Sequence, residues 1–185
     1  MAEVIEIRLP EEADRLRQLK AGDEVRLSGT LYTMRDAGHE RCLAYLHQEG
    51  KLPFGLKGQT LFYAGPTPPR AGLPFGAIGP TTASRMDFAT PELYQAGIVA
   101  TIGKGKRSAA VAQACMDYQG VYLAAVGGVA ALLATCVTSA ECIGWEDLGT
   151  EALFRIEVEG FPAFVELDTQ GADLYRQIEE GSSLP

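Results

Sequence analysis

The stretch "IVATIGKGKRSAAVAQACMDYQGVYLAAVGG", residues 98–128, decides the class of fold. Residues 98–103 and 121–128 are short apolar runs typical of buried strands, and the pattern of residues 106–120 between them predicts a helix. A strand, a helix and a second strand in this order form the repeating unit of α/β domains. We therefore expect an α/β fold with a mixed sheet and flanking helices.

The rest of the chain continues this alternation in both directions. Residues 129–137 predict a further helix, and residues 151–168 predict a hairpin with Gly160 at its turn. No repeat or linker divides the chain, so we expect one domain over 1–185, with a frayed tail at 178–185. Upstream, the pattern predicts strands over 3–9, 24–36 and 59–66, a short acidic helix or turn over 10–23, helices over 36–50 and 90–97, and a loop over 67–80.

Charge and hydropathy exclude two classes of protein. The net charge of -8 and the pI of about 4.8 argue against a nucleic-acid binder, which needs a basic face. The longest apolar stretch, residues 121–137, is interrupted by glycines and is shorter than the roughly 20 residues of a spanning helix, so we expect it in the core. The first residues carry acids where a secretory signal would carry Lys or Arg. We therefore expect a cytoplasmic protein with no membrane partner.

The four cysteines do not follow the spacing of a metal site. They are scattered, and no C-x-x-C pair occurs, so the pattern does not favour zinc or cluster ligation by this chain alone. We expect reduced core thiols and no metal ligand in this chain. The cysteines are Cys42, Cys115, Cys136 and Cys142.

The stretch "GAIGPTTASRMD", residues 76–87, suggests an anion site. Thr81 or Thr82 is a good N-cap for a short helix, whose first amides have no partner within the helix and attract anions. Arg85 lies four residues after Thr81, so both fall on one helix face, where they can hold a carboxylate. The same residues also fit an ordinary cap with a solvated arginine.

Two further stretches place polar groups after predicted strands. In "TMRDAGHER", residues 33–41, Arg35 ends a strand, Asp36 is predicted to cap the next helix, and His39 beside Asp36 suits acid–base work. The alternative for His39 is a surface histidine at a helix start.

In "IGKGKRS", residues 102–108, glycines flank Lys104 and allow a ligand to approach the backbone. We expect the neighbouring Lys106 and Arg107 to be solvated. Three cations after three separate strands, with Thr81 and His39 among them, suggest a pocket for a dicarboxylate.

These stretches together resemble one family. "LSGTLYTMRDAGHERC" (27–42), "YAGPTP" (63–68), "GPTTASRMD" (79–87), "GKGKRS" (103–108) and "EVEGFPAFVELD" (157–168) occur in the order seen in the β subunit, or C-terminal domain, of iron–sulfur hydro-lyases of the class I fumarate hydratase and L(+)-tartrate dehydratase type. The resemblance runs from about residue 20 to about residue 170. It implies a swivelling β/β/α domain and reversible addition of water across the double bond of a small dicarboxylate.

The resemblance also implies a partner and residue roles. A [4Fe-4S] cluster is held by the cysteines of an α subunit, with which this chain would form a hetero-oligomer, such as an αβ pair or a dimer of such pairs. Arg35, Arg85 and Lys104 correspond to substrate carboxylate binders. Thr81 corresponds to the base of the fumarate hydratase branch, and His39 to the catalytic histidine of the tartrate dehydratase branch. The supporting residues are Asp36, Gly79 and Thr82.

The residues leave several functions open. "KGKRS" (104–108) is closer to the fumarate hydratase form, which favours fumarate and malate as substrates. Tartrate and mesaconate are the alternatives within the family. An alternative of another class is a non-catalytic domain that binds a carboxylate or docks on another protein. A standalone hydrolase with His39 and a threonine nucleophile is disfavoured, because no triad spacing or oxyanion motif stands out.

Overall fold

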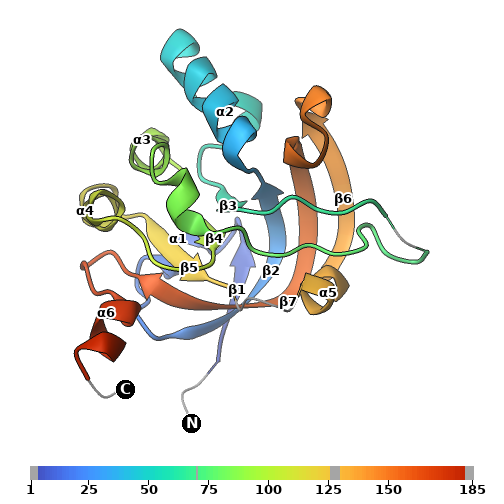
Figure 1. Cartoon of the computed structure of the whole chain (residues 1–185). Coiled ribbons are helices and arrows are strands. Elements are labelled where there is room, and N and C mark those ends of the chain that lie inside the picture. The colour runs from blue at the N-terminus through green and yellow to red at the C-terminus, as the bar shows by residue number, and fades with distance from the viewer. Residues whose placement is uncertain (1–3, 70, 126–129, 182–185) are drawn as a thin grey trace.

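The computed structural model describes residues 4–69, 71–125 and 130–181. Within these ranges, seven strands form one mixed sheet, which confirms the α/β class (Figure 1). The strands are β1 (Ile5–Leu9), β2 (Glu24–Thr33), β3 (Thr60–Phe62), β4 (Ala100–Gly103), β5 (Val121–Ala124), β6 (Val137–Gly144) and β7 (Leu153–Leu167).

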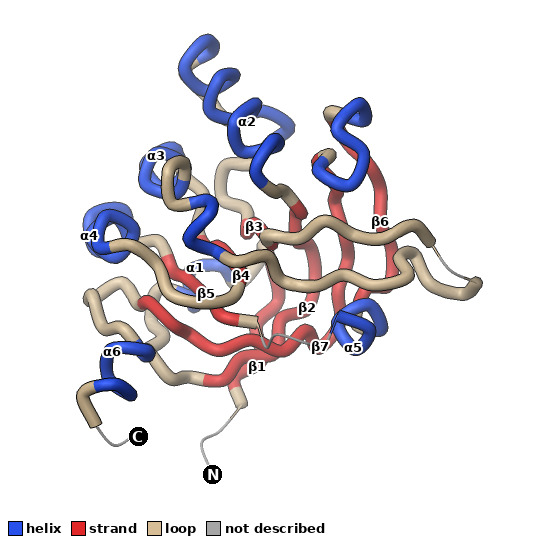
Figure 2. Tube along the Cα trace, in the orientation of Figure 1, coloured by secondary structure: helices blue, strands red, loops and turns tan. Residues whose placement is uncertain are grey.

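The helices flank this sheet. Figure 1 shows α2, α3 and α4 in a row along one side of the sheet, whereas α5 lies apart from them next to β6. Both ends of the described chain lie near one another, on the side away from α2 (Figure 2). The α-helices are α1 (Ala13–Leu16), α2 (Asp36–Glu49), α3 (Thr90–Ala96), α4 (Ala109–Tyr118), α5 (Ala130–Thr135) and α6 (Leu174–Glu179), and the 3₁₀ helices are η1 (Pro53–Gly55), η2 (Ala83–Met86) and η3 (Glu146–Glu151).

The sheet closes on itself through β2 and β7. Strand β2 pairs in parallel with β1 and β3, and antiparallel with β7 over its whole length. Strands β3, β4 and β5 continue in parallel, and β5 returns to the end of β7 in an antiparallel pairing. The path from β2 through β3, β4, β5 and β7 back to β2 is therefore a ring, so these five strands have few exposed edges.

Alternating side chains of the ring fill two cores. On β4, Ala100 and Ile102 belong to one apolar cluster, while Thr101 between them faces the other side and is also buried. On β5, Leu123 joins the first cluster and Tyr122 the second. Because both faces are covered, the strands read as continuous apolar runs, which is the pattern of residues 98–103 in the sequence.

The sheet opens at the carboxyl ends of β3 and β4, where another segment enters. The Thr81 amide donates to the Tyr63 carbonyl (2.6 Å), and the Lys104 amide donates to the Thr81 carbonyl (3.1 Å). A Cβ at Gly103 would lie 2.9 Å from the Ala83 Cβ, so glycine is needed for this close approach. Residues 81–83, which we call the wedge, therefore lie between the carboxyl ends of two parallel strands, the region in which α/β proteins bind ligands.

The predicted hairpin over residues 151–168 is wrong. Strand β7 is one strand of 15 residues, and Gly160, with a φ of 62°, lies in a bulge where the register with β2 shifts between Leu27 and Gly29. The Gly160 amide donates to the Ser28 hydroxyl across this bulge. A glycine with positive φ can occupy either a bulge within a strand or the turn of a hairpin. The pairing of β7 with β2 decides in favour of the bulge.

Two further elements differ from the prediction. The helix predicted over 129–137 is shorter, because α5 ends at Thr135 and Val137 begins β6, a strand that the sequence analysis did not foresee. In the tail predicted to fray, 178–179 belong to α6, whereas 182–185 lie outside the described residues, as do 126–128 at the end of the predicted strand. Among the described helices, none has the length and hydrophobicity needed to cross a bilayer.

Candidate active site

Two of the three predicted cations meet at the end of β2. Arg85, on η2, donates from Nε and Nη2 to the two carboxylate oxygens of Asp36, at 3.0 and 2.8 Å. The Nε of Arg35 lies 3.8 Å from Asp36 Oδ2. Lys104 follows β4 directly and is exposed, and its backbone pairs with the wedge. The structure thus brings Arg35 and Arg85 together around one carboxylate and places Lys104 next to Thr81 and Thr82.

Asp36 has a different local role from the predicted one. Arg35, with extended backbone angles, is the N-cap of α2, and Asp36 is the first helical residue. A carboxylate in the first turn is still favoured by the helix dipole. Its two oxygens, however, bind Arg85 in the fork geometry that a bound substrate carboxylate would use. Arg85 therefore already holds a carboxylate in the free chain.

An acid that the sequence analysis missed completes the surroundings of Arg35. Glu151, at the end of η3, has Oε1 3.7 Å from the Arg35 Nε and accepts from the Ala37 amide through Oε2. Arg35 also lies against Gly65, because a Cβ there would come within 2.8 Å of Arg35 Nη1. No local sequence signal could have found Glu151, since it is far from Arg35 along the chain.

The N-cap of the short helix is Thr82, one of the two predicted residues. Helix η2 is a single 3₁₀ element, and its N-cap, Thr82, makes no side-chain capping bond. The amides of Thr81, Ala83 and Arg85 donate to backbone carbonyls. These amides are therefore not available to an anion, and the predicted anion site at a helix start is wrong in this respect. What the segment offers a ligand is the half-buried Thr81, the exposed Thr82 and the Arg85 guanidinium.

Gly79 lies against α5, and His39 is buried next to the backbone of Arg35. A Cβ at Gly79 would come 3.1 Å from the Cβ of Ala130, so this glycine lets the incoming loop approach α5. His39 is 0% exposed, and its ring packs edge-on against Tyr63 with centroids 5.1 Å apart. Its Nδ1 lies 2.8 Å from the carbonyl oxygen of Arg35, which can only accept. His39 therefore carries its proton on Nδ1, and its buried Nε2 has no partner among the described residues.

Burial sets the charge of His39. Desolvation lowers its pKa to about 4, and the nearby Arg107 acts in the same direction, while the bond to the Arg35 carbonyl and the charge of Asp36 oppose the shift. The ring is therefore neutral at pH 7. The alternative of a surface histidine is wrong, and a role as an acid at neutral pH does not fit this environment.

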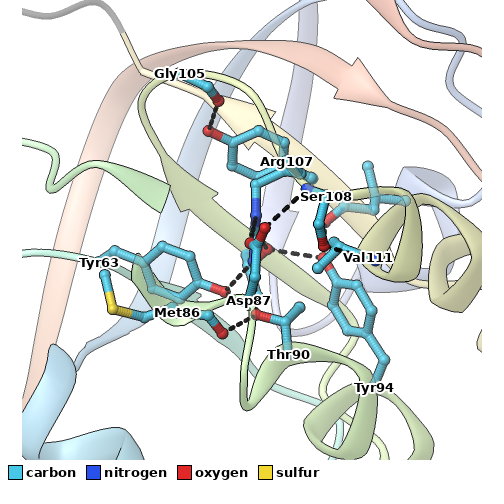
Figure 3. A network of polar contacts seen from close by, with 12 residues as sticks. Tyr63, Met86, Asp87, Thr90, Tyr94, Gly105, Arg107, Ser108 and Val111 are labelled. Carbon is cyan, nitrogen blue, oxygen red and sulfur yellow. Dashed lines mark hydrogen bonds and ion pairs between the residues drawn. The ribbon is translucent and has the colours of Figure 1, made fainter. Parts of the chain in front are cut away.

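Arg107, predicted to be solvated, is the most deeply buried cation of the site region. Its side chain is 0% exposed, and its Nε donates to Asp87 Oδ1 at 2.7 Å (Figure 3). Its Nη2 donates to the Thr90 hydroxyl at 2.6 Å, and the guanidinium lies over the rings of Tyr63 and Tyr122. Burial alone would lower the pKa of Arg107, but Tyr63, Tyr94 and Asp87 raise it above the usual value, so the guanidinium stays charged.

This buried ion pair joins the two segments that carry the candidate site. Asp87 also accepts from the Ser108 amide through its second oxygen, at 2.7 Å. Asp87 directly follows η2, which carries Arg85, whereas Arg107 and Ser108 follow Lys104. One carboxylate therefore fixes the loop of Lys104 against the segment of Arg85, as Figure 3 shows from close by. Lys106 lies at the surface, as predicted, where it pairs with Glu179.

A pocket of about 540 Å³ lies beside the wedge. Thr82, Lys104 and Gly105 contribute to its lining, so the pocket borders the wedge, whereas Arg35 and Arg85 do not line it. The cysteines take no part in it: all four are free, as predicted, and Cys42 and Cys115 are buried. In the described ranges, no group of three or more His, Cys, Asp or Glu side chains could hold a metal ion.

One family model and several curated relatives match nearly the whole of this chain. A family model described as "Fumarase C-terminus" matches residues 1–178. Fumarate hydratase 1 (mitochondrial) of Leishmania major is 40% identical over 173 residues, or 92% of this chain and 31% of the relative. The aerobic class I fumarate hydratase of Escherichia coli K12 is 39% identical over 166 residues, or 89% and 30%.

A shorter relative matches along nearly its whole length. The putative L(+)-tartrate dehydratase subunit beta of Methanocaldococcus jannaschii is 36% identical over 171 residues, which cover 89% of this chain and 88% of the relative. The chain therefore spans about a third of the length of the fumarate hydratases and almost all of this subunit.

Arg107→Met should destabilise the fold by about 3–5 kcal/mol, because it leaves the Asp87 carboxylate without its buried partner. Lys106→Ala, which removes an exposed cation one position away, should leave the free energy of unfolding close to that of the wild type. Urea unfolding at pH 7 measures both. Equal effects of the two substitutions would contradict the central role of the buried pair.

The burial of His39 should appear as acid sensitivity. Its pKa falls from about 6.5 in the unfolded chain to about 4 in the folded one, so its contribution to stability is present above pH 6.5 and is lost as the pH falls through 4. Between pH 7.5 and pH 4.5, the wild type should lose about 2–3 kcal/mol more of its free energy of unfolding than His39→Gln. Urea unfolding at both pH values measures this difference, and His47→Gln, which alters an exposed histidine, should behave as the wild type. A constant difference between His39→Gln and the wild type would contradict the prediction.

Proposed function

The chain belongs to the fumarase C-terminus family, and we propose that it is the component of a dicarboxylate hydro-lyase that binds the substrate carboxylates, with reversible hydration of fumarate to malate as the reaction. The observation that carries this proposal is the grouping of Arg35 and Arg85 around one carboxylate, with Lys104 beside the wedge. Two forked guanidinium groups and one ammonium suit the two carboxylates of such a substrate.

Arg85 and Arg35 bind one carboxylate of the substrate in this proposal, and Lys104 binds the other. The Asp36 carboxylate holds Arg85 in the fork geometry before substrate arrives, which reduces the entropy lost on binding. When substrate binds, its carboxylate either shares the guanidinium with Asp36 or replaces it. The exposed part of the Arg85 side chain, 49%, leaves a path for this exchange.

Thr81 handles the proton at the reacting carbon in this proposal, and His39 is a positioning residue. Thr81 is half-buried in the wedge next to Lys104, whereas the ring of His39 is buried behind Arg35. The Nδ1–H of His39 donates a hydrogen bond to the Arg35 carbonyl. The ring therefore fixes the backbone from which the Arg35 guanidinium extends. A threonine hydroxyl becomes a better base where nearby cations stabilise its anion, and we propose Lys104, whose backbone amide donates to the Thr81 carbonyl, as that cation.

A partner chain carries the [4Fe-4S] cluster in this proposal. The cysteines of this chain do not fit the cluster, because the described residues contain no group that could hold a metal ion and two of the four cysteines are buried. The name of the Methanocaldococcus relative, subunit beta, supports a separate partner subunit, since this chain matches that relative along most of its length. We therefore assign an α subunit as partner and a hetero-oligomer as the active form.

Tartrate dehydration is the second candidate function. It is favoured because this chain matches the Methanocaldococcus relative along most of that relative's length. Tartrate and malate share two carboxylates and a hydroxyl next to one of them, so Arg35, Arg85 and Lys104 would serve both. The substrates differ in a second hydroxyl, and a site that binds this group discriminates strongly against a substrate without it.

Anaerobic reconstitution of this chain with a cluster-bearing α partner tests the proposed function. The pair should hydrate fumarate and dehydrate malate, and neither chain should do so alone. Tartrate and mesaconate complete the substrate panel, and a preference for tartrate would establish the second candidate. Failure on all four substrates, with the cluster intact by its absorption spectrum, would refute the hydro-lyase.

Arg85→Ala should lower kcat/KM by about tenfold to a hundredfold in the reconstituted enzyme, because a charge-assisted contact to the substrate contributes about 1.5–3 kcal/mol. The fold should be unaffected, since the side chain is half exposed. Arg41→Ala is the matched control: Arg41 also binds a carboxylate through two nitrogens, that of Asp147 at 2.7 and 2.8 Å, but lies outside the site. If Arg85→Ala and Arg41→Ala had equal kcat/KM, Arg85 would not bind the substrate.

Thr81→Ala should lower kcat at least about a hundredfold with little change in KM, because proton transfer contributes on this scale. Thr81→Ser, which keeps a hydroxyl, should restore much of the rate. His39→Gln should instead raise KM more than it lowers kcat, since it acts through the position of Arg35. Steady-state kinetics of the three variants decide the assignment, and the reverse pattern would make His39 the base.

A further inference from the structure

Glu166 is an acid in a bulge of the strand that closes the sheet. On β5 and β7, Tyr122 faces Leu167 and Leu123 faces Val165, so Glu166 is the extra residue on β7. A bulge redirects a side chain that regular pairing would send elsewhere, and bulges are common next to active sites. Glu166 is 0% exposed. The strand therefore places a carboxyl group inside the molecule.

Among the described residues, no N–H or O–H donor binds the carboxyl oxygens of Glu166, which in its acid form shares its proton with the neighbouring Asp173 carboxylate. A buried polar group without a partner costs folding free energy, and a sequence keeps such a group where function needs it. Burial raises the pKa of Glu166 to about 8, with the neighbouring acids Asp173 and Asp87 acting in the same direction and Arg107 opposing them. In the free chain at pH 7, Glu166 is therefore a neutral acid with a hydrogen to donate.

Glu166 lines the pocket beside the wedge, and the acceptor that a bound carboxylate would replace is the neighbouring Asp173 carboxylate. Lys104 is the one cation among the described residues that line this pocket, and the small side chains of Ala124 and Ala125 leave space in it. A pocket with one ammonium and one neutral acid attracts an anion that can accept a hydrogen bond. A cationic ligand would instead be repelled by Lys104.

We propose that this pocket binds a small carboxylate, with Lys104 supplying the positive charge and Glu166, in its acid form, donating a hydrogen bond to a carboxylate oxygen. The inference rests on the proposed role of Lys104 and adds Glu166 to the site as a second group that holds the same carboxylate. A buried carboxylic acid that stays neutral in order to donate is a known catalytic device. Ionised Glu166 would repel the ligand, so binding depends on its proton.

The pH dependence follows from this linkage. Affinity should be constant from pH 6 to about 8 and should then fall about tenfold per pH unit, because each bound ligand keeps one proton on Glu166. The other titratable or charged groups that line the pocket or act on Glu166 electrostatically are Lys104, Arg107, Asp87, Asp173, Cys115, Tyr122 and Tyr175.

Calorimetric titration of the 185-residue chain with succinate, an unreactive dicarboxylate, between pH 6 and 9.5 tests the proposal. The wild type should show the fall above pH 8. Glu166→Gln keeps a donor and should bind at all pH values with a flat profile. Glu166→Leu should bind about tenfold or more weakly at pH 6.5, since a hydrogen bond to a charged group is lost. Glu141→Gln, which alters an exposed strand glutamate, should match the wild type.

The ionisation of Glu166 can also be observed directly. With ¹³C-labelled glutamate carboxyl groups, one signal should titrate near pH 8, should be absent in Glu166→Gln, and should shift to higher pH with succinate. A signal that titrates between pH 4 and 5, or a wild-type affinity that is flat to pH 9.5, would overturn the proposal. So would methylammonium binding that strengthens above pH 8, which would make the pocket a cation site.

These outcomes separate the inference from the proposed function. If the reconstituted enzyme hydrates fumarate but the succinate profile of the chain does not depend on Glu166, the inference fails and the function stands. If succinate binding follows the predicted profile but no hydration occurs with any partner, the function fails and the carboxylate pocket stands. Because Glu166→Gln preserves shape, its flat profile remains a test even where Glu166→Leu does not fold.

Discussion

The buried ion pair between Arg107 and Asp87 holds together the two segments that carry the candidate site. A charged pair removed from water costs desolvation free energy, which is offset only where the remaining donors and acceptors are satisfied. Here Arg107 also donates to Thr90 and lies over two tyrosine rings, and Asp87 also accepts from the Ser108 amide. These contacts connect the loop after β4 with the segment after η2, so the positions of Lys104 and Arg85 depend on one another.

The chain balances the charge of Arg35 and Arg85, the two arginines that we propose as substrate binders. Arg85 binds Asp36 through two nitrogens, and Arg35 lies within 4 Å of both Asp36 and Glu151. In a protein with a net charge of -8, such pairs prevent an exposed cluster of positive charge and hold the guanidinium groups in a binding geometry. The ligand that gains most from this arrangement is one that brings its own carboxylate. Lys104, which forms no ion pair among the described residues, adds charge at the other side of the wedge.

Local patterns in the sequence predicted elements and the positions of cations, but not their partners. Strand ends at Arg35 and Lys104 follow from apolar runs and glycines, which are local signals. The solvated state expected for Arg107 was wrong, because its partner Asp87 and the tyrosine rings come from other parts of the chain. Gly160 is not a turn for the same reason: a long antiparallel pairing with β2 makes β7 continue through the bulge. Glu166 was missed because an alternating strand pattern does not reveal an extra residue in a bulge.

Burial reverses the usual order of the pKa values of two titratable groups near the site, His39 and Glu166. In water, a glutamate loses its proton near pH 4 and is ionised at pH 7, whereas a histidine loses its proton near pH 6.5 and keeps a minor charged fraction at pH 7. In this fold, burial lowers the pKa of His39 to about 4 and raises that of Glu166 to about 8, so both are neutral at pH 7. A buried cation at His39 would repel Arg35, and a buried anion at Glu166 would compete with a carboxylate for Lys104. With both groups neutral, the field in the site is set by Arg35, Arg85 and Lys104 and by the acids that pair with the arginines. The hydrophobic surroundings of the two groups therefore favour binding of the dicarboxylate that we propose as substrate, because they keep both groups neutral. Over the same range of pH, the histidine stays a hydrogen-bond acceptor and the glutamate a donor.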